Sequence, residues 1–108
     1  MIHGQSIRKI LNMTNAQEII DVLRAQQSTL SAQFSVQRIG LFGSFARNEA
    51  KPGSDVDILV DLASPTFDHF MDLKFFLEDL LHASVDLVPS DALKPRLRPY
   101  VIREIIYA

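Results

Sequence analysis

The chain contains no cysteine, which excludes a disulfide framework, a thiolate metal site and a cysteine nucleophile. Long hydrophobic runs are missing as well. The longest spans residues 105–108, far short of the roughly 20 residues that a membrane-spanning helix needs. The first residues lack the apolar segment of a signal peptide. We therefore expect a cytoplasmic protein that does not enter a membrane.

An excess of positive charge is also missing, since 11 Lys and Arg residues face 13 Asp and Glu residues. Proteins whose main task is to bind nucleic acid usually present a basic face, so we expect no direct nucleic-acid binding. What the chain does have is typical of a globular protein: 47% hydrophobic and 22% charged residues in a length of 108. That length fits one domain.

The hydrophobic pattern predicts alternating helices and strands. Thr14 and Gln17 resemble a capping box, and Ser64-Pro65 resembles a helix start. Strands are indicated by two-residue alternation, which is clearest over 55–62. The expected elements are helices at 15–26 and 28–34, a strand at 36–42, a short helix at 44–47, a strand at 55–62, a helix at 65–82, a strand at 84–88 and a closing helix at 96–107. This order predicts an α/β domain (α+β) over 15–108, preceded by an extension at 1–14.

Two aspartates, Asp55 and Asp57, lie two positions apart on the clearest predicted strand. Their carboxylates therefore project from the same face, about 7 Å apart along the backbone. Like charges so placed repel unless they share a cation, and oxygen ligands favour Mg²⁺ or Mn²⁺. Taken alone, the pair is more typical of a solvated acidic edge of the sheet, because acidic pairs are common on protein surfaces.

A third aspartate, Asp86, lies in the short apolar strand Val85-Asp86-Leu87-Val88. The connection between Asp57 and Asp86 is long enough to place their strands side by side. Three carboxylates on neighbouring strands can hold two divalent ions about 4 Å apart, as in phosphoryl and nucleotidyl transfer. Alone, Asp86 could be an edge-strand charge that deters aggregation.

Gly43-Ser44 lies where a predicted strand turns into a helix. Such a turn lets a phosphate approach the backbone, where free N–H groups and the serine hydroxyl can hold its oxygens. The alternative is an ordinary turn. Arg47 could touch phosphate, or it could pair with Glu49 or with a strand aspartate.

Together these features resemble a known family. Gly43-Ser44-Phe45-Ala46-Arg47, ten residues between Ser44 and Asp55, and then Asp55-Val56-Asp57 resemble the Gly-Ser-x10-Asp-x-Asp signature of the polymerase-β-type nucleotidyltransferase superfamily. The short length and the segments 85–88, 92–95 and 103–107 resemble the minimal nucleotidyltransferases (MNT) over residues 15–108. One departure is Asn48, where many relatives have Gly, and we expect Asn48 to adopt the same left-handed turn.

The resemblance implies a small nucleotidyltransferase fold with a three- or four-stranded mixed sheet packed by helices. It also implies that Asp55 and Asp57 ligate two Mg²⁺ ions, or Mn²⁺, and that Asp86 completes the catalytic one. By the same resemblance Gly43 and Ser44 hold the nucleoside triphosphate, expected to be ATP, with Arg47 as a further candidate.

The implied function is transfer of AMP from ATP to a hydroxyl, expected to be a tyrosine of a HEPN-domain ribonuclease toxin. The chain would then be an antitoxin that assembles with this toxin or with itself. The alternative is the same fold neutralising the toxin by contact alone. An antibiotic nucleotidyltransferase is disfavoured because those relatives carry an additional helical domain. Nucleic-acid polymerisation is least favoured, given the charge and the missing template-binding domains.

The helix predicted over 65–82 has one aromatic residue off its apolar side. Its core stripe is expected to comprise Phe67, Phe70, Leu73, Leu77, Leu80 and Leu81. Phe75 falls opposite, among acidic residues. It is either a contact for a partner or second copy, or a lone exposed phenylalanine.

Overall fold

The computed structural model describes residues 15–108, and the predicted Thr14 cap and the extension at 1–14 lie outside the described part. Within it, four strands form one sheet in the order β3-β2-β1-β4. The strands are β1 (Val36–Phe42), β2 (Val56–Leu62), β3 (Val85–Pro89) and β4 (Ile106–Tyr107). β2 runs parallel to β3, whereas β1 is antiparallel to both β2 and β4. The sheet is therefore mixed, as predicted.

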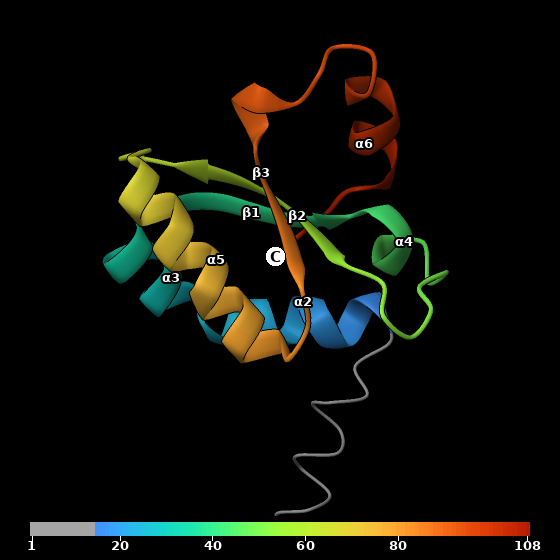
Figure 1. Ribbon diagram of the computed structural model, residues 1–108, viewed down its shortest axis with the longest axis horizontal. Helices are drawn as coiled ribbons and strands as arrows, with labels where there is room; N and C mark the ends of the chain where they lie inside the picture. The colour runs from blue at the N-terminus through green and yellow to red at the C-terminus, as the bar shows by residue number, and fades with distance from the viewer. Residues whose placement is uncertain (1–14) are drawn as a thin grey trace, which may run out of the picture.

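One face of the sheet is covered by α2 (Ala16–Ala25), α3 (Gln27–Phe34) and α5 (Phe67–Leu81) (Figure 1). Apolar residues repeat at helical spacing in α2 and at two-residue spacing in the strands, so both surfaces present a continuous apolar side. The result is the main core. Its most fully buried side chains are Ile19, Ile20, Leu23, Leu30, Leu41, Ile58, Leu73 and Leu77.

The other face carries a smaller cover. The short 3₁₀ helix η1 (Ser90–Ala92) and the helix α6 (Arg98–Glu104) lie on it (Figure 1). Leu59, Leu93 and Val101 form a second buried cluster there. Because side chains alternate along a strand, Ile58 of β2 faces the main core while Leu59 faces the small one.

The two predicted helix starts are displaced by one or two residues. Asn15 caps α2: its Oδ1 accepts from the Glu18 N–H at 2.9 Å, and its Nδ2 donates to Glu18 Oε1 at 3.0 Å. Thr66 caps α5 by accepting from the His69 N–H at 3.1 Å, so the predicted start at Ser64-Pro65 is wrong. In both cases a neighbouring residue with an equally suitable side-chain oxygen takes the cap.

The predicted closing helix at 96–107 is also wrong in extent. α6 ends at Glu104, and Ile106–Tyr107 form β4 against Gly40 and Leu41 of β1. A Cβ on Gly40 would lie 2.8 Å from the Ile105 side chain, so this glycine allows the chain to pack closely on β1. The Ala108 N–H extends the pairing by donating to the Ile39 carbonyl at 3.0 Å. Branched apolar residues at the chain's end suit a strand as well as a helix.

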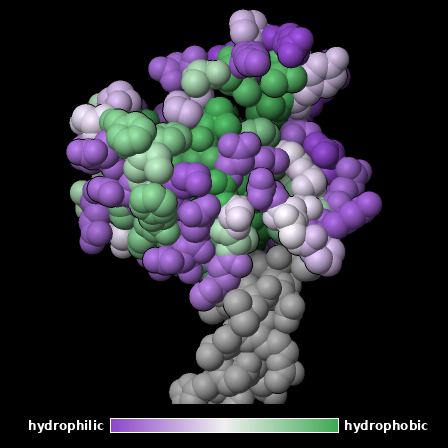
Figure 2. Space-filling view, viewed as in Figure 1, coloured by the Kyte–Doolittle hydropathy of each residue, from purple (hydrophilic) through white to green (hydrophobic). Residues whose placement is uncertain are grey.

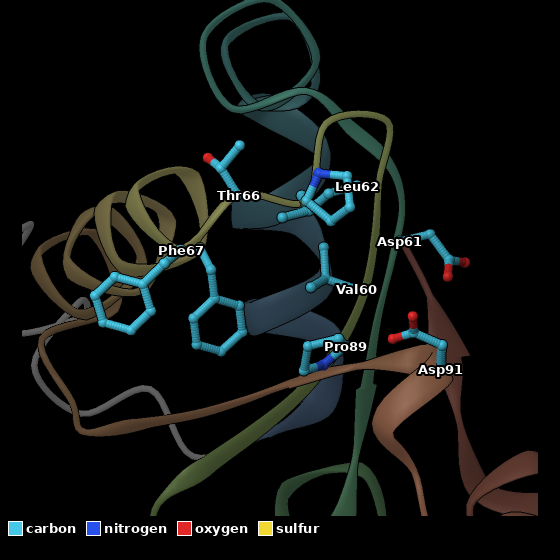
Figure 3. A pocket seen from close by; sticks show the side chains of 9 residues that line it. Val60, Asp61, Leu62, Thr66, Phe67, Pro89 and Asp91 are labelled. Atoms are coloured by element: carbon cyan, nitrogen blue, oxygen red, sulfur yellow. The ribbon is translucent and has the colours of Figure 1, made fainter.

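The predicted stripe of α5 holds except at its start. Leu73, Leu77 and Leu81 are buried, but Phe67 is 75% exposed. As the first residue of the helix, Phe67 lies at the edge of a cavity of about 450 Å³ near the end of β2. Figure 3 shows Asp61 and Asp91 on the opposite side of this cavity from Phe67. Phe75 is 54% exposed, which confirms the predicted orientation.

Over residues 15–108, no helix has the length and apolar character required to cross a membrane.

Candidate active site

A tight turn joins β1 to the short helix α4 (Gly43–Ala46). Gly43 has a φ of +74°, and a Cβ there would overlap Asp57 Oδ2. Only glycine meets both demands without strain. Asn48 ends the turn with a φ of +56°, as predicted, and its Oδ1 accepts from the Ala16 N–H at 3.0 Å. The Gly43-Ser44 turn is thus fixed against both β2 and α2.

The aspartates of β2 and β3 meet across the sheet. Asp57 pairs with Asp86 in the parallel register, and on its other side Asp57 is opposite Phe42 of β1. Directly paired residues of neighbouring strands share a face, so Asp57 and Asp86 project from the same side. Asp55 lies one residue before β2 and is exposed. Phe42, Asp57 and Asp86 therefore form one row, which begins at the residue before Gly43.

The pKa of Asp57 is shifted by the acidic side chains around it. Asp57 is half-buried, and its pKa is raised to about 6, first by burial and then by the negative charges of Asp86, Asp55 and Glu104. The positive charge of Arg47 partly opposes this rise in pKa. The charges of both other aspartates therefore act on Asp57, and a cation bound beside Asp57 would stabilise its ionised form.

The chemistry of the site fits a divalent metal. Within residues 15–108, no three His, Asp or Glu side chains form a ready-made ligand set. The available donors are nevertheless carboxylate oxygens, which Mg²⁺ and Mn²⁺ prefer. Asp57 and Asp86 are cross-strand neighbours on one face of the sheet, so both carboxylates are candidate ligands of the same ion. The Asp57 carboxylate occupies the space that a Cβ on Gly43 would fill, so the carboxylate lies directly against the Gly43 turn.

The orientation of Asp86 is set by the way β3 begins. The Val85 N–H donates to Glu78 Oε2 at 3.0 Å, and this hydrogen bond lowers the pKa of Glu78. Lys74 lies 3.4 Å from the same carboxylate. Val85 and Leu87 point into the core, so Asp86 between them is exposed on the opposite face.

Glu104, which was not among the predicted site residues, also lies at the site. Its Oε2 accepts from the Gly43 N–H at 2.6 Å, and its Oε1 accepts from Arg47 Nη1 at 2.9 Å. Arg47 also pairs with Glu49 at 2.9 Å, which was one of its predicted alternatives, and within residues 15–108 it forms no ion pair with a strand aspartate. A carboxylate of α6 thus rests on the turn expected to hold phosphate.

A cavity of about 390 Å³ adjoins the aspartates, and we call it the α6 cavity. Its walls include Asp86 and Glu104, together with the apolar side chains of Val88 in β3, Val101 in α6 and Leu93, which follows η1. Figure 2 shows a band of hydrophobic surface that descends from the region of α6 toward β3. The cavity near Phe67 is lined by none of the three candidate aspartates. Of these two cavities, the α6 cavity is therefore the one whose lining includes a candidate aspartate.

Comparison with known proteins identifies the family. Residues 23–108 match the nucleotidyltransferase domain family. Protein adenylyltransferase MntA from Thermococcus cleftensis is 44% identical over 96 residues, which cover 88% of this chain and 97% of that protein. The chain therefore belongs to the nucleotidyltransferase domain family.

Comparison with solved structures identifies the subgroup of this family that the chain resembles in fold. A solved structure described as a minimal nucleotidyltransferase has a TM-score of 0.66 and 41% identity, covering 81% of this chain and 93% of that one. A structure of the tri-AMPylated Shewanella oneidensis HEPN toxin in complex with its MNT antitoxin matches with a TM-score of 0.53 and 26% identity, covering 84% and 66%. This chain is a minimal nucleotidyltransferase related to the MntA antitoxins of HEPN/MNT pairs.

Proposed function

We propose that this chain transfers AMP from ATP to a tyrosine hydroxyl of a HEPN-domain toxin and thereby acts as its antitoxin. The observation that carries the proposal is the row in which Asp57 and Asp86 are cross-strand partners beside the Gly43 turn. The names of its relatives support the same reaction, because they include a protein adenylyltransferase and an AMPylated toxin complex. ATP and Mg²⁺ are both abundant in the cytoplasm, where we place the reaction.

Phosphate binding is assigned to the Gly43-Ser44 turn. Backbone N–H groups and the Ser44 hydroxyl can donate to phosphate oxygens, and the absence of a side chain at Gly43 lets the Asp57 carboxylate lie directly beside these donors. The Gly43 N–H is held by Glu104 at 2.6 Å, so a phosphate bound at this amide takes the place of that carboxylate. Arg47, released from Glu104 by the same exchange, can then face the phosphate.

Asp55 and Asp57 would hold two Mg²⁺ ions, and Asp86 would complete the site of one of them. When bound, the ions neutralise phosphate charge and lower the pKa of the acceptor hydroxyl. Asp86 is exposed and can accept the proton of the phenolic O–H. The phenolic oxygen then forms a bond to the α-phosphorus of ATP, and the bond from that phosphorus to the bridging oxygen breaks. The products are tyrosine-O-AMP and pyrophosphate.

The alternative function is neutralisation of the toxin by contact alone. Retention of all three aspartates and of Gly43-Ser44 favours the enzyme, since pure contact needs none of them. Phe75, which is 54% exposed, stays a predicted contact for the toxin or for a second copy under either function.

The test is to incubate the chain and its HEPN toxin with ATP labelled on the α-phosphate, in the presence of Mg²⁺. We expect label on the toxin, its loss with Asp57→Asn, and its retention with Asp21→Asn. Asp21 is a matched control because it is exposed on α2, which covers the opposite face of the sheet. Neutralisation of the toxin by Asp57→Asn at the wild-type level, without label, would support contact alone.

A further inference from the structure

We propose that the α6 cavity is the acceptor pocket: it holds the aromatic ring of the tyrosine to be modified and directs its hydroxyl to Asp86. This inference rests on the proposed function and deepens it by assigning a site to the acceptor. The cavity measures about 390 Å³ and shares Asp86 with the aspartate row. Whatever fills it therefore lies beside the catalytic carboxylates.

The direction of attack favours an acceptor in this cavity. In nucleotidyl transfer the attacking and leaving oxygens lie roughly in line through the phosphorus. The leaving pyrophosphate is assigned to the Gly43 turn at the end of β1, and Asp57 lies on β2. The strand order β3-β2-β1 then places the attacking hydroxyl on the side of β3. The α6 cavity extends to that side, because Asp86 and Val88 of β3 are among the residues that line it, together with Phe42 of β1.

The lining of the cavity suits an aromatic ring with one polar end. Val88, Leu93 and Val101 are apolar lining residues, whereas Asp86, Glu104 and Lys94 are the charged ones. A phenol meets both demands, because its ring is apolar and its hydroxyl donates to a carboxylate. Serine or threonine would leave the apolar lining residues uncovered.

Two exposed apolar side chains also line the cavity. Tyr100 is 65% exposed and Leu97 is 44% exposed, and both line the cavity. Aromatic and aliphatic side chains at a cavity rim are typical of binding surfaces, where a partner covers them. An incoming tyrosine, together with the backbone that carries it, would contact these two side chains first.

The same helix provides a matched control. Ile102 is 60% exposed on α6 and is absent from the cavity lining. Leu97→Ser, Tyr100→Ser and Ile102→Ser each remove an exposed apolar side chain, so none should cost the fold more than a small amount. Only the first two should affect the cavity.

The experiment is an NMR titration with N-acetyl-tyrosinamide as the probe, in the presence of Mg²⁺ and the non-hydrolysable ATP analogue AMP-PNP. We expect the methyl signals of Val88, Leu93 and Val101 to shift as the probe binds. Leu97→Ser and Tyr100→Ser should each weaken this binding by about fivefold to tenfold, as for other interface anchors. Ile102→Ser should bind like the wild type. The affinity for AMP-PNP should be the same in all four proteins.

Two results would overturn the acceptor pocket. If AMP-PNP alone shifts the three methyl signals and loses affinity in Leu97→Ser, the cavity holds the nucleobase. If neither compound shifts them, the cavity binds no part of the reaction. Failure of the proposed function is a separate outcome, because it would show as tyrosinamide bound in the cavity without any labelled toxin.

Discussion

The two faces of the sheet are built for different tasks, although β2 contributes to both. On the face under α2, α3 and α5, Ile58 is fully buried in a large apolar core. One residue earlier and on the other face, Asp57 is half-buried beside Asp86 and carries a pKa raised to about 6. The two-residue period of a strand thus separates stabilisation from chemistry within a single element.

This division explains how so small a domain tolerates three acidic groups in one place. Charge repulsion on the exposed face lowers stability by a modest amount, whereas the opposite face contributes most of the apolar burial. The comparison therefore predicts that substitutions on one face change activity and those on the other change stability.

The largest effect is expected on the acidic face. Asp57→Asn should reduce AMP transfer by about a hundredfold to a thousandfold, because it removes a charged ligand at the reacting phosphate. The initial rate of label transfer to the toxin measures this change. Circular dichroism should show an unchanged fold. A variant with wild-type activity would remove Asp57 from the mechanism.

The matching substitution on the core face is Leu77→Ala. Leu77 is 0% exposed, so the lost burial and the cavity should lower the free energy of unfolding by about 3 kcal/mol. Urea denaturation measures this value. The rate of transfer per folded molecule should stay close to that of the wild type, and a large loss of rate would show that the two faces are coupled.

Two glycine substitutions distinguish an effect on the active-site turn from a general effect of backbone strain. Gly43→Ala should lower stability by about 1–3 kcal/mol and impair transfer, because Gly43 has a φ of +74° and a Cβ there overlaps Asp57. Gly53→Ala is the control, since Gly53 has a φ of +87° with no atom within 4 Å of the added Cβ. It should cost about 1 kcal/mol, measured by urea denaturation, and leave transfer intact. Equal rates in the two variants would contradict the role assigned to the turn.

The smallest effect is a pH-dependent gain in stability. The folded-state pKa of Asp57, about 6, lies above its ordinary value of 3.8, so ionisation of Asp57 destabilises the folded state. In the absence of metal, its contribution to stability is present below about pH 4 and is lost as the pH rises through 6. Asp57→Asn should therefore be more stable than the wild type by about 1 kcal/mol at pH 7.5, a value reduced for solvent screening.

Thermal denaturation from pH 3.5 to 8 checks this prediction, and the difference should vanish at the acidic end. Added Mg²⁺ should stabilise the wild type more than the variant at pH 7.5, because only the wild type retains the full ligand set. A constant difference across the pH range would show that repulsion is not its cause.

Much of this arrangement could be predicted from the sequence because its signals are local. The alternation over 55–62 indicates a strand with aspartates on one face, and Gly43-Ser44 marks the turn before it. The pairing of Asp57 with Asp86 also followed, because a strand–helix–strand connection places the two strands in parallel contact.

The parts that were missed depend on contacts distant in sequence. Glu104 reaches Gly43 across 61 positions, and no spacing rule relates them. β4 has only two residues, and its pairing with Gly40 decides between strand and helix. Phe67 occupies a helical position on the apolar side, but as the first residue of α5 it lines a cavity near the end of β2 and stays 75% exposed.

The central claim, a divalent-metal site between β2 and β3, is tested most directly by Mn²⁺ binding. Titration calorimetry with Mn²⁺ and AMP-PNP should show that Asp86→Asn lowers the affinity for metal by at least about tenfold, whereas Asp79→Asn, on the helix behind the opposite face, binds like the wild type. Wild-type affinity in Asp86→Asn would show that the two strands do not share a metal and would contradict the account.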